Sequence, residues 1–161
     1  MNYRGWWRAV GCLLLITVAA EESLPSGFKQ WTAASLKQVA QKIHADAEQD
    51  PHHFAVEQLA DFQNESVLLV HREADGQVEW HETQADIFFI QSGSATLLVG
   101  GTMLNAETVG PHEKRNGSIQ GGHRKKLSPG DIVRIPPRVP HQVLLEGTPA
   151  FDYVAIKVKG Y

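Results

Sequence analysis

The stretch that decides the fold is residues 75–99, which read DGQVEWHETQADIFFIQSGSATLLV. Apolar and polar residues alternate here over short runs, and turn residues separate the runs. A period of two places successive side chains on opposite faces of a β-strand. The Asp75-Gly76 pair predicts a hairpin between two of these strands, and Ser92-Gly93-Ser94 predicts another turn. This segment therefore predicts several short β-strands joined by tight turns.

The same pattern continues on both sides of this segment. Candidate strands lie near 54–60, 66–72, 77–82, 86–92, 95–99, 131–135, 141–146 and 151–158. Many short strands after one leading helix favour an all-β sandwich or jelly-roll barrel over parallel βαβ units. We therefore expect residues 51–161 to form one all-β barrel domain.

One amphipathic helix is expected before the strands, over about 31–47. Its apolar residues recur at helical spacing: Leu36, Val39, Ala40 and Ile43. Thr32 or Ser35 offers an N-cap, and the Asp-Pro pair at 50–51 ends the helix. His44 on this helix is expected to be polar surface.

The first twenty residues have the pattern of a signal peptide. Arg4 and Arg8 form a positive region, an apolar run follows over 11–20, and small residues precede a cleavage point after Ala20. The apolar run is shorter than the roughly 20 residues that span a bilayer. We therefore expect an exported protein, periplasmic or extracellular. Its parts would be a signal peptide at 1–20, a linker and helix at 21–50, and the barrel at 51–161.

The bulk composition excludes several classes of function. At 161 residues the chain suits a single domain, and a net charge of −3 provides no basic field for nucleic acid or for a membrane after processing. Cys12 is the only cysteine and lies in the expected signal peptide. The processed protein would therefore have no disulfide, no thiolate nucleophile and no cysteine-based zinc site.

Three side chains that can bind a metal are expected to meet near one end of a hairpin, and a fourth candidate lies much later in the sequence. Glu79 and His81 share one face of a strand, and the turn at 82–85 can place Asp86 beside them. Much later, His141 follows a proline-rich turn at 136–140 and begins a strand. Imidazole and carboxylate groups are common ligands of divalent metals.

The sequence resembles the cupin family over about residues 76–145. The first cupin motif holds two histidines, an acid and a glycine, and the matching positions here are Glu79, His81, Asp86 and Gly93. The second motif holds a glycine, a proline and a histidine, and the matching positions are Gly130, Pro136 and His141. Three positions depart from the motifs: Glu79 replaces a histidine, Asp86 a longer glutamate and Arg138 a glycine.

The resemblance implies a double-stranded β-helix, the jelly-roll cupin barrel, with a divalent cation at Glu79, His81, Asp86 and His141. Manganese, iron, zinc and nickel all suit two imidazoles with carboxylates. The shorter Asp86 leaves open a site of three ligands, Glu79, His81 and His141. Glu82 turning inward, or His112 and His123 from a long connection at 105–122, are further ways to complete the ligand set. Small cupins often dimerise, so a homodimer is also expected.

Two functions follow from these observations. The first is a metal-dependent enzyme of lyase, isomerase or dioxygenase type on a small organic substrate. Its candidate acid and base groups are Glu79, Glu82 and Glu113. Its candidate substrate contacts are Phe88, Tyr153, Lys157 and His112. The alternative is a non-catalytic module that binds a sugar or a small carboxylic acid, and a third possibility is a structural domain whose histidines only pack in the core.

The last strand leaves the orientation of two of these contacts open. Tyr153 and Lys157 alternate with Asp152, Val154 and Ile156, and either set can face the barrel interior. Tyr153 and Lys157 are surface groups if the second set faces inward.

Overall fold

The computed structural model describes residues 24–161, so the expected signal peptide at 1–20 lies outside the described residues. The chain divides into two compact units, at 1–30 and 31–161. In the first unit, Phe28 N donates to Pro25 O at 3.1 Å and closes a turn. In residues 24–161, no helix is long and apolar enough to cross a membrane.

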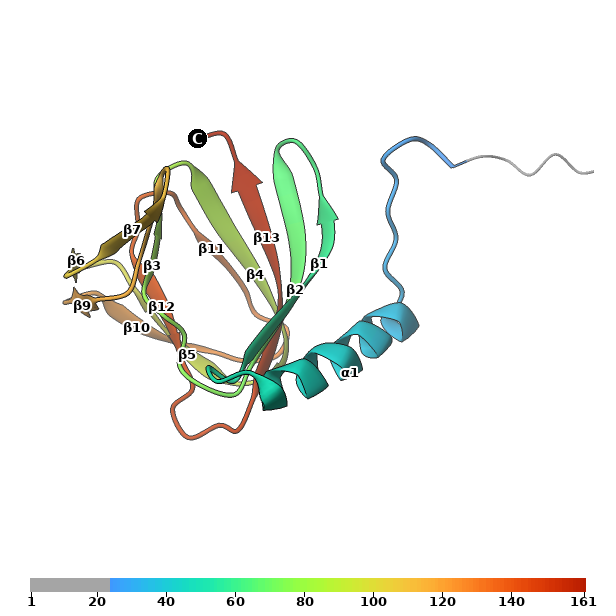
Figure 1. Cartoon of the computed structure of the whole chain (residues 1–161), viewed down its shortest axis with the longest axis horizontal. Coiled ribbons are helices and arrows are strands. Elements are labelled where there is room, and N and C mark those ends of the chain that lie inside the picture. Colours follow the sequence, from blue (N-terminus) through green and yellow to red (C-terminus); the bar gives the residue numbers. More distant parts are fainter. Residues whose placement is uncertain (1–23) are drawn as a thin grey trace, which may run out of the picture. The chain divides into compact units, whose positions relative to one another are not determined.

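The second unit begins with helix α1 (Ala33–Gln49), close to the expected range. Thr32 is the N-cap, and its side-chain oxygen accepts a hydrogen bond from Ser35 N at 3.1 Å. The helix ends at Gln49 because the residue before Pro51 is held in an extended conformation. Helix α1 packs on strands β1 (Phe54–Asp61) and β2 (Glu65–Arg72) (Figure 1). Ile43 and Ala47 of the helix are buried.

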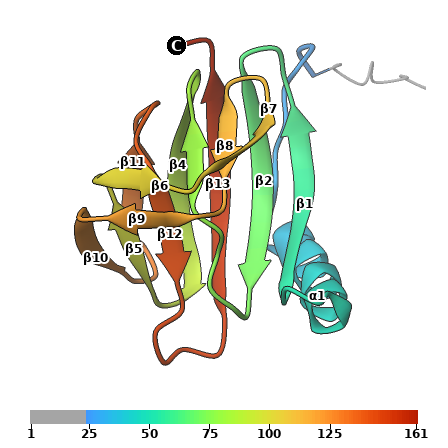
Figure 2. The same cartoon turned by 60° about the vertical axis from the view of Figure 1, so that its left-hand side comes forward.

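The strands form two main sheets that face each other (Figures 1 and 2). The first has the order β1-β2-β13-β4-β11. Its strands are β1 (Phe54–Asp61), β2 (Glu65–Arg72), β4 (Gln84–Gly93), β11 (Ile132–Ile135) and β13 (Phe151–Lys159). The second has the order β10-β5-β12-β3-β8-β7. Its strands are β3 (Glu79–His81), β5 (Ala95–Val99), β7 (Glu107–Gly110), β8 (Glu113–Arg115), β10 (His123–Leu127) and β12 (His141–Leu144).

A separate antiparallel pair joins β6 (Thr102–Leu104) to β9 (Ser118–Gln120). Pairing is antiparallel in both main sheets as well. The core lies between the sheets, where β13 buries Phe151, Tyr153 and Ala155 on one face. Of the two orientations left open for this strand, the structure has the one with Tyr153 inside.

The hairpin predicted at Asp75-Gly76 is wrong. Strand β2 belongs to the first sheet and β3 to the second, so the chain crosses between sheets here. Asp75 Oδ1 instead accepts from Leu145 N at 2.7 Å, and Gly76 N donates to Val143 O at 2.8 Å. These bonds fasten the crossing segment to the far end of β12.

The long connection predicted at 105–122 is also wrong. This segment contains strands β7, β8 and β9, and β8 pairs with β3. The Gly121-Gly122 pair lies in the short turn between β9 and β10. Both of its glycines have positive φ, at 79° and 85°. The segment is therefore not a free loop: β7 and β8 belong to the second sheet, and β9 pairs with β6.

Candidate metal centre

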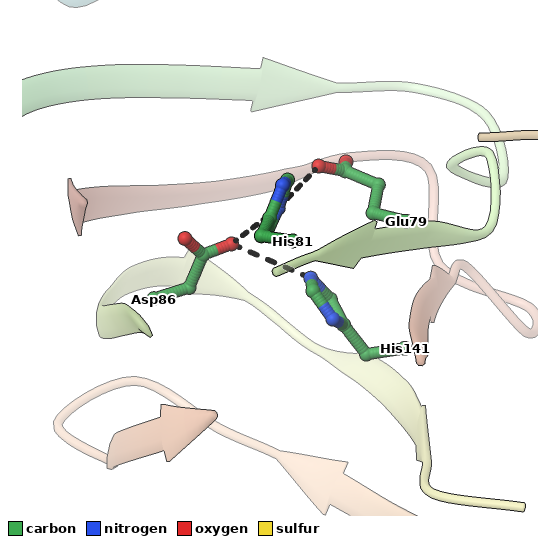
Figure 3. A group of neighbouring side chains, drawn as sticks. All are labelled: Glu79, His81, Asp86 and His141. Carbon is green, nitrogen blue, oxygen red and sulfur yellow. Dashed lines mark ion pairs between the residues drawn. The ribbon is translucent and has the colours of Figure 1, made fainter. Parts of the chain in front are cut away.

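Four metal-capable side chains converge between the two sheets (Figure 3). Glu79 and His81 lie two residues apart on β3 and so share a face. His141 begins β12, where it is the register partner of Glu79. Asp86 comes from β4 in the opposite sheet. The structure brings together the four residues predicted as ligands, while their binding of a metal stays a prediction.

The spacing of the donor atoms fits one divalent ion. His81 Nε2 lies 3.3 Å from Asp86 Oδ2 and 3.4 Å from Glu79 Oε2. His141 Nε2 lies 3.4 Å from the same Asp86 oxygen. Neighbouring donors that each lie about 2.1 Å from one ion are about 3.0–3.4 Å apart. The shorter aspartate therefore reaches the cluster.

His141 carries the strongest indication that a cation belongs here. The residue is 2% exposed, and its Nδ1 bonds Val139 O at 3.1 Å. Because a carbonyl only accepts, this bond places a proton on Nδ1, and in the neutral ring Nε2 then carries a lone pair. Among the described residues, that buried Nε2 has no hydrogen-bond partner, and it faces the Asp86 carboxylate. A cation between these two electron-rich groups would satisfy both.

His81 has a similar environment on its other ring nitrogen. In residues 24–161, its buried Nδ1 has no hydrogen-bond partner, and Glu113 Oε1 lies 3.8 Å away. Glu113 is the register partner of His81 on β8, and it accepts a hydrogen bond from Arg115 Nε at 2.8 Å. The structure therefore places Glu113 beside the His81 ring, at a distance too long for a hydrogen bond.

Lys157, predicted as a substrate contact, lies inside the cluster. Its Nζ is 3.0 and 3.1 Å from the two carboxylate oxygens of Asp86 and 3.2 Å from His81 Nε2. An ammonium group thus stands beside two of the predicted ligands.

Two arginines at the site were not predicted from the sequence. Arg115 Nη1 lies 3.2 Å from Glu79 Oε2, and Arg72 Nη2 lies 3.6 Å from Glu79 Oε1. Arg72 had a sequence signal, because alternation along β2 places it on one face with Leu68 and Val70. Arg115 had none, because its position depends on the pairing of β8 with β3.

The charges of the cluster reinforce one another. Burial raises the pKa of Glu79, but the hydrogen bond with His81 and the charge of Lys157 lower that pKa by more. Burial also raises the pKa of Asp86, and interactions with His141, His81 and Lys157 again outweigh it. Both carboxyl groups therefore stay ionised at neutral pH. The pKa of His81 is raised, because hydrogen bonds to the two carboxylates exceed the opposing effect of burial.

Phe88 and Tyr153 line a cavity of about 350 Å³ beside the cluster, as does Lys157. The rings of Phe88 and Tyr153 lie 4.7 Å apart, and Phe88 is 6.4 Å from the His141 ring. Glu82 and His112 are elsewhere. They pair with each other at the exposed surface, at 2.7 Å, so the structure leaves both outside the site.

A second group of metal-capable residues lies on the other face of the first sheet. Asp152 Oδ1 is 2.6 Å from His71 Nδ1 and 3.0 Å from His44 Nε2, and Ser92 Oγ donates to the other oxygen of Asp152. His71 Nε2 also lies 3.3 Å from Glu73 Oε1. The polar atoms of this group already form hydrogen bonds with one another. His44, expected to be plain polar surface, therefore ties α1 to the sheet.

No protein-family model and no curated protein matches this sequence. Solved structures do match. A protein with a double-stranded β-helix domain from Klebsiella pneumoniae aligns with a TM-score of 0.50 and 17% identity, over 66% of this chain and 77% of that one. The chain has the double-stranded β-helix fold that the resemblance to cupins implies. The predicted all-β barrel with one leading helix is thereby confirmed.

Other solved structures match to a similar degree. KdgF from Halomonas sp. aligns with a TM-score of 0.50 and 16% identity, over 70% of this chain and 84% of that one. The DMSP lyase DddQ from Ruegeria pomeroyi aligns with a TM-score of 0.47 and 18% identity, over 65% of this chain and 46% of that one.

Proposed function

We propose that this cupin binds a divalent metal through Glu79, His81, Asp86 and His141 and acts as a metal-dependent enzyme on a small organic substrate. The observation that carries the proposal is the buried Nε2 lone pair of His141, which faces a carboxylate and has no hydrogen-bond partner among the described residues. Leaving such an atom unsatisfied costs roughly 1–3 kcal/mol. A metal ligand is the role that removes this cost.

The chain's own groups would act on a substrate held in the adjoining cavity. A bound divalent ion would polarise a carbonyl or carboxylate, or activate water or dioxygen. Lys157 Nζ can donate a hydrogen bond or a proton to a substrate oxygen, because it lines the cavity. Phe88 and Tyr153 give that cavity an aromatic wall that limits water. Lyase, isomerase and dioxygenase reactions are the types this arrangement suits.

The types of ligand atom limit which metal can bind. Two imidazoles with two carboxylates suit manganese, iron, zinc or nickel, and affinity alone would favour zinc or nickel over manganese or iron. The native ion is therefore to be identified in protein taken from its own compartment.

A metal-free binding module is the second candidate, and one observation favours it. Lys157 Nζ already stands 3.0 Å from Asp86 and 3.2 Å from His81, in the position of a cation. In that case, the same cavity would hold a sugar or a small carboxylic acid without reaction.

Metal analysis of untagged protein separates the two candidates. The proposed enzyme should hold about one divalent ion per chain, and His141→Ala should lose it. His112→Ala is the matched control, because His112 is exposed and outside the cluster, so this variant should keep the metal. A folded wild-type protein without metal would refute the enzyme and favour the binder. A His141→Ala variant that retains the metal would refute the proposed ligand set.

We propose, further, that the protein is exported and that its signal peptide is cleaved after Ala20. The charged, apolar and small-residue regions of 1–20 support this proposal. The mature protein from the native host should then begin at Glu21, which N-terminal sequencing or intact mass would show. Pairing of two copies through a sheet edge belongs to the same proposal, and light scattering of the mature protein tests it.

A further inference from the structure

Two hollows meet beside the predicted metal ligands. One is the cavity of about 350 Å³ inside the barrel, and the other, of about 360 Å³, lies on the side of residues 51–54. Four residues line both: Phe54, Arg72, Glu79 and Arg115. A small molecule reaching the metal ligands from the second hollow would therefore pass these side chains.

Arg72 is buried in this junction with its outer nitrogens unused. The residue is 8% exposed. Its Nε donates to Tyr153 Oη at 3.0 Å, and its guanidinium carbon lies 4.4 Å from the centre of the Phe54 ring. Its one carboxylate neighbour, Glu79, is 3.6 Å away, which is too long for a hydrogen bond. Among the described residues, Nη1 and Nη2 thus donate to no acceptor.

The backbone makes room for this guanidinium at Gly76. A Cβ atom there would lie 3.0 Å from Arg72 Nη1 and 3.3 Å from Val143 O. Glycine at this position therefore allows Arg72 to keep its place, between Tyr153 at one edge and Phe54 below one face. The side chain is fixed while its two outer nitrogens stay free.

The charge balance of the site calls for an anion. Three cations, Arg72, Arg115 and Lys157, face three carboxylates, Glu79, Asp86 and Glu113. A divalent ion added to this set would leave an excess positive charge in a partly buried site. Uncompensated charge of this kind is costly, and a negatively charged ligand removes the excess.

We propose that Arg72 binds a carboxylate group of the ligand through Nη1 and Nη2, so that this protein takes small organic acids. The inference rests on the proposed function and deepens it by naming the substrate class. Arg115 Nη1 and Nη2 lie near Glu79 and Glu113, so Arg115 adds positive potential and Arg72 provides the contact. A cavity of about 350 Å³ is at the small end for ligand sites, which suits a short acid.

The shape of the donor group favours carboxylate over phosphate. The two outer nitrogens of one arginine lie in a plane and match the two oxygens of a carboxylate. Proteins often bind phosphate with backbone N–H groups at helix N-termini or in glycine-rich loops. The residues that line the two hollows come from strands and from 51–53 and 74–77, and none comes from α1.

Calorimetric titration of the full chain tests the proposal, with malonate as the probe. Its uncharged diamide, malonamide, and inorganic phosphate are the comparison ligands. Each titration is run on metal-loaded protein and on protein treated with a chelator and dialysed. Arg72→Gln should weaken malonate binding about 10- to 100-fold, the value of a charged hydrogen-bond pair. Arg72→Lys should also weaken it, because an ammonium group lacks the planar fork.

Arg124→Gln is the matched control. Arg124 is exposed and pairs with Glu146, away from both hollows, so this variant should bind malonate as the wild type does. If Arg72→Gln does not fold, Arg72→Lys decides the result. The proposal is overturned if malonate binds neither protein form, if malonamide or phosphate binds as tightly, or if the Arg72 variants bind like the wild type. If chelated protein binds malonate through Arg72 and wild-type protein never holds a metal, the proposed metal-dependent enzyme is refuted. The proposed carboxylate site at Arg72 would still stand.

Discussion

Lys157 Nζ lies 3.0 Å from Oδ1 and 3.1 Å from Oδ2 of Asp86, so an ammonium group faces both oxygens of a predicted metal ligand. A divalent ion bound by Asp86 would stand within a few ångströms of this charge. Two unit charges about 4 Å apart repel by about 4 kcal/mol at an effective dielectric constant of 20. Lys157 therefore opposes the binding of the metal.

Removing this charge should tighten metal binding. We expect Lys157→Met to lower the dissociation constant for zinc by at least about tenfold, as measured by competition with a fluorescent chelator. Lys159→Met is the control, because Lys159 lies on the same strand and pairs with Asp61 instead. Equal affinities in the two variants would show that Lys157 does not compete with the ion.

The sequence predicted the ligand cluster because its geometry is mostly local. Glu79 and His81 share a face by the period of two alone, and the spacing of Asp86 and His141 matched two known motifs. Arg115 could not be found in this way. It reaches the site only because β8 pairs with β3, and such pairing between distant segments leaves no periodic signal in a strand of three residues.

The same limit explains the errors in the fold. Asp75-Gly76 has the residues of a hairpin turn, but the flanking strands find their partners in different sheets, and Gly76 is not in the left-handed region. The segment at 105–122 contains strands of three or four residues, too short to show alternation. Turn chemistry is local, whereas sheet membership is decided by the whole barrel.

Gly93 should be irreplaceable at the bend between β4 and β5. Its φ is 72°, and a Cβ atom there would lie 2.1 Å from Ala150 O. Gly93→Ala should therefore cost at least about 3 kcal/mol of unfolding free energy, from backbone strain and a clash together. Gly147→Ala carries only the strain, about 1–2 kcal/mol, because Gly147 has φ 79° and open space around it. Urea denaturation compares the two, and equal losses would contradict this account.

Tyr153 should make the protein sensitive to alkali. Burial raises the pKa of its hydroxyl, although the charge of Arg72 opposes the shift. The folded state then holds this proton at a pH where the unfolded chain has lost it. The titration of Tyr153 should leave the free energy of unfolding unchanged below the ordinary pKa of about 10. Above that pH it should lower the free energy of unfolding by up to about 1.4 kcal/mol per pH unit.

Tyr153→Phe removes this titration. Its free energy of unfolding should be lower than the wild-type value at pH 8, because Arg72 Nε loses its acceptor. The difference in the free energy of unfolding between wild type and variant should narrow between pH 10 and 11. Urea denaturation at each pH measures this difference. A gap that is constant over this range would mean that Tyr153 titrates no differently when folded.

Asp152 should make the stability of the protein depend on pH in the acid range, in the opposite direction to Tyr153. Burial raises the pKa of its carboxyl group, but hydrogen bonds from Ser92, His71 and His44 lower that pKa by more. A depressed pKa in the folded state contributes stability above the unfolded value of about 3.9, and this contribution is lost as the pH falls through the folded value. Asp152→Asn should therefore be destabilised at pH 7 by roughly 1–3 kcal/mol, and this difference should shrink below pH 4.

The matched control for this acid effect is Glu57→Gln. Glu57 is exposed and pairs with Lys42 on α1, so its loss should change the stability little at either pH. Thermal unfolding at pH 7 and pH 3.5 compares all three proteins. If Asp152→Asn stays as far below the wild type at pH 3.5 as at pH 7, the carboxylate charge is not what holds α1 to the sheet.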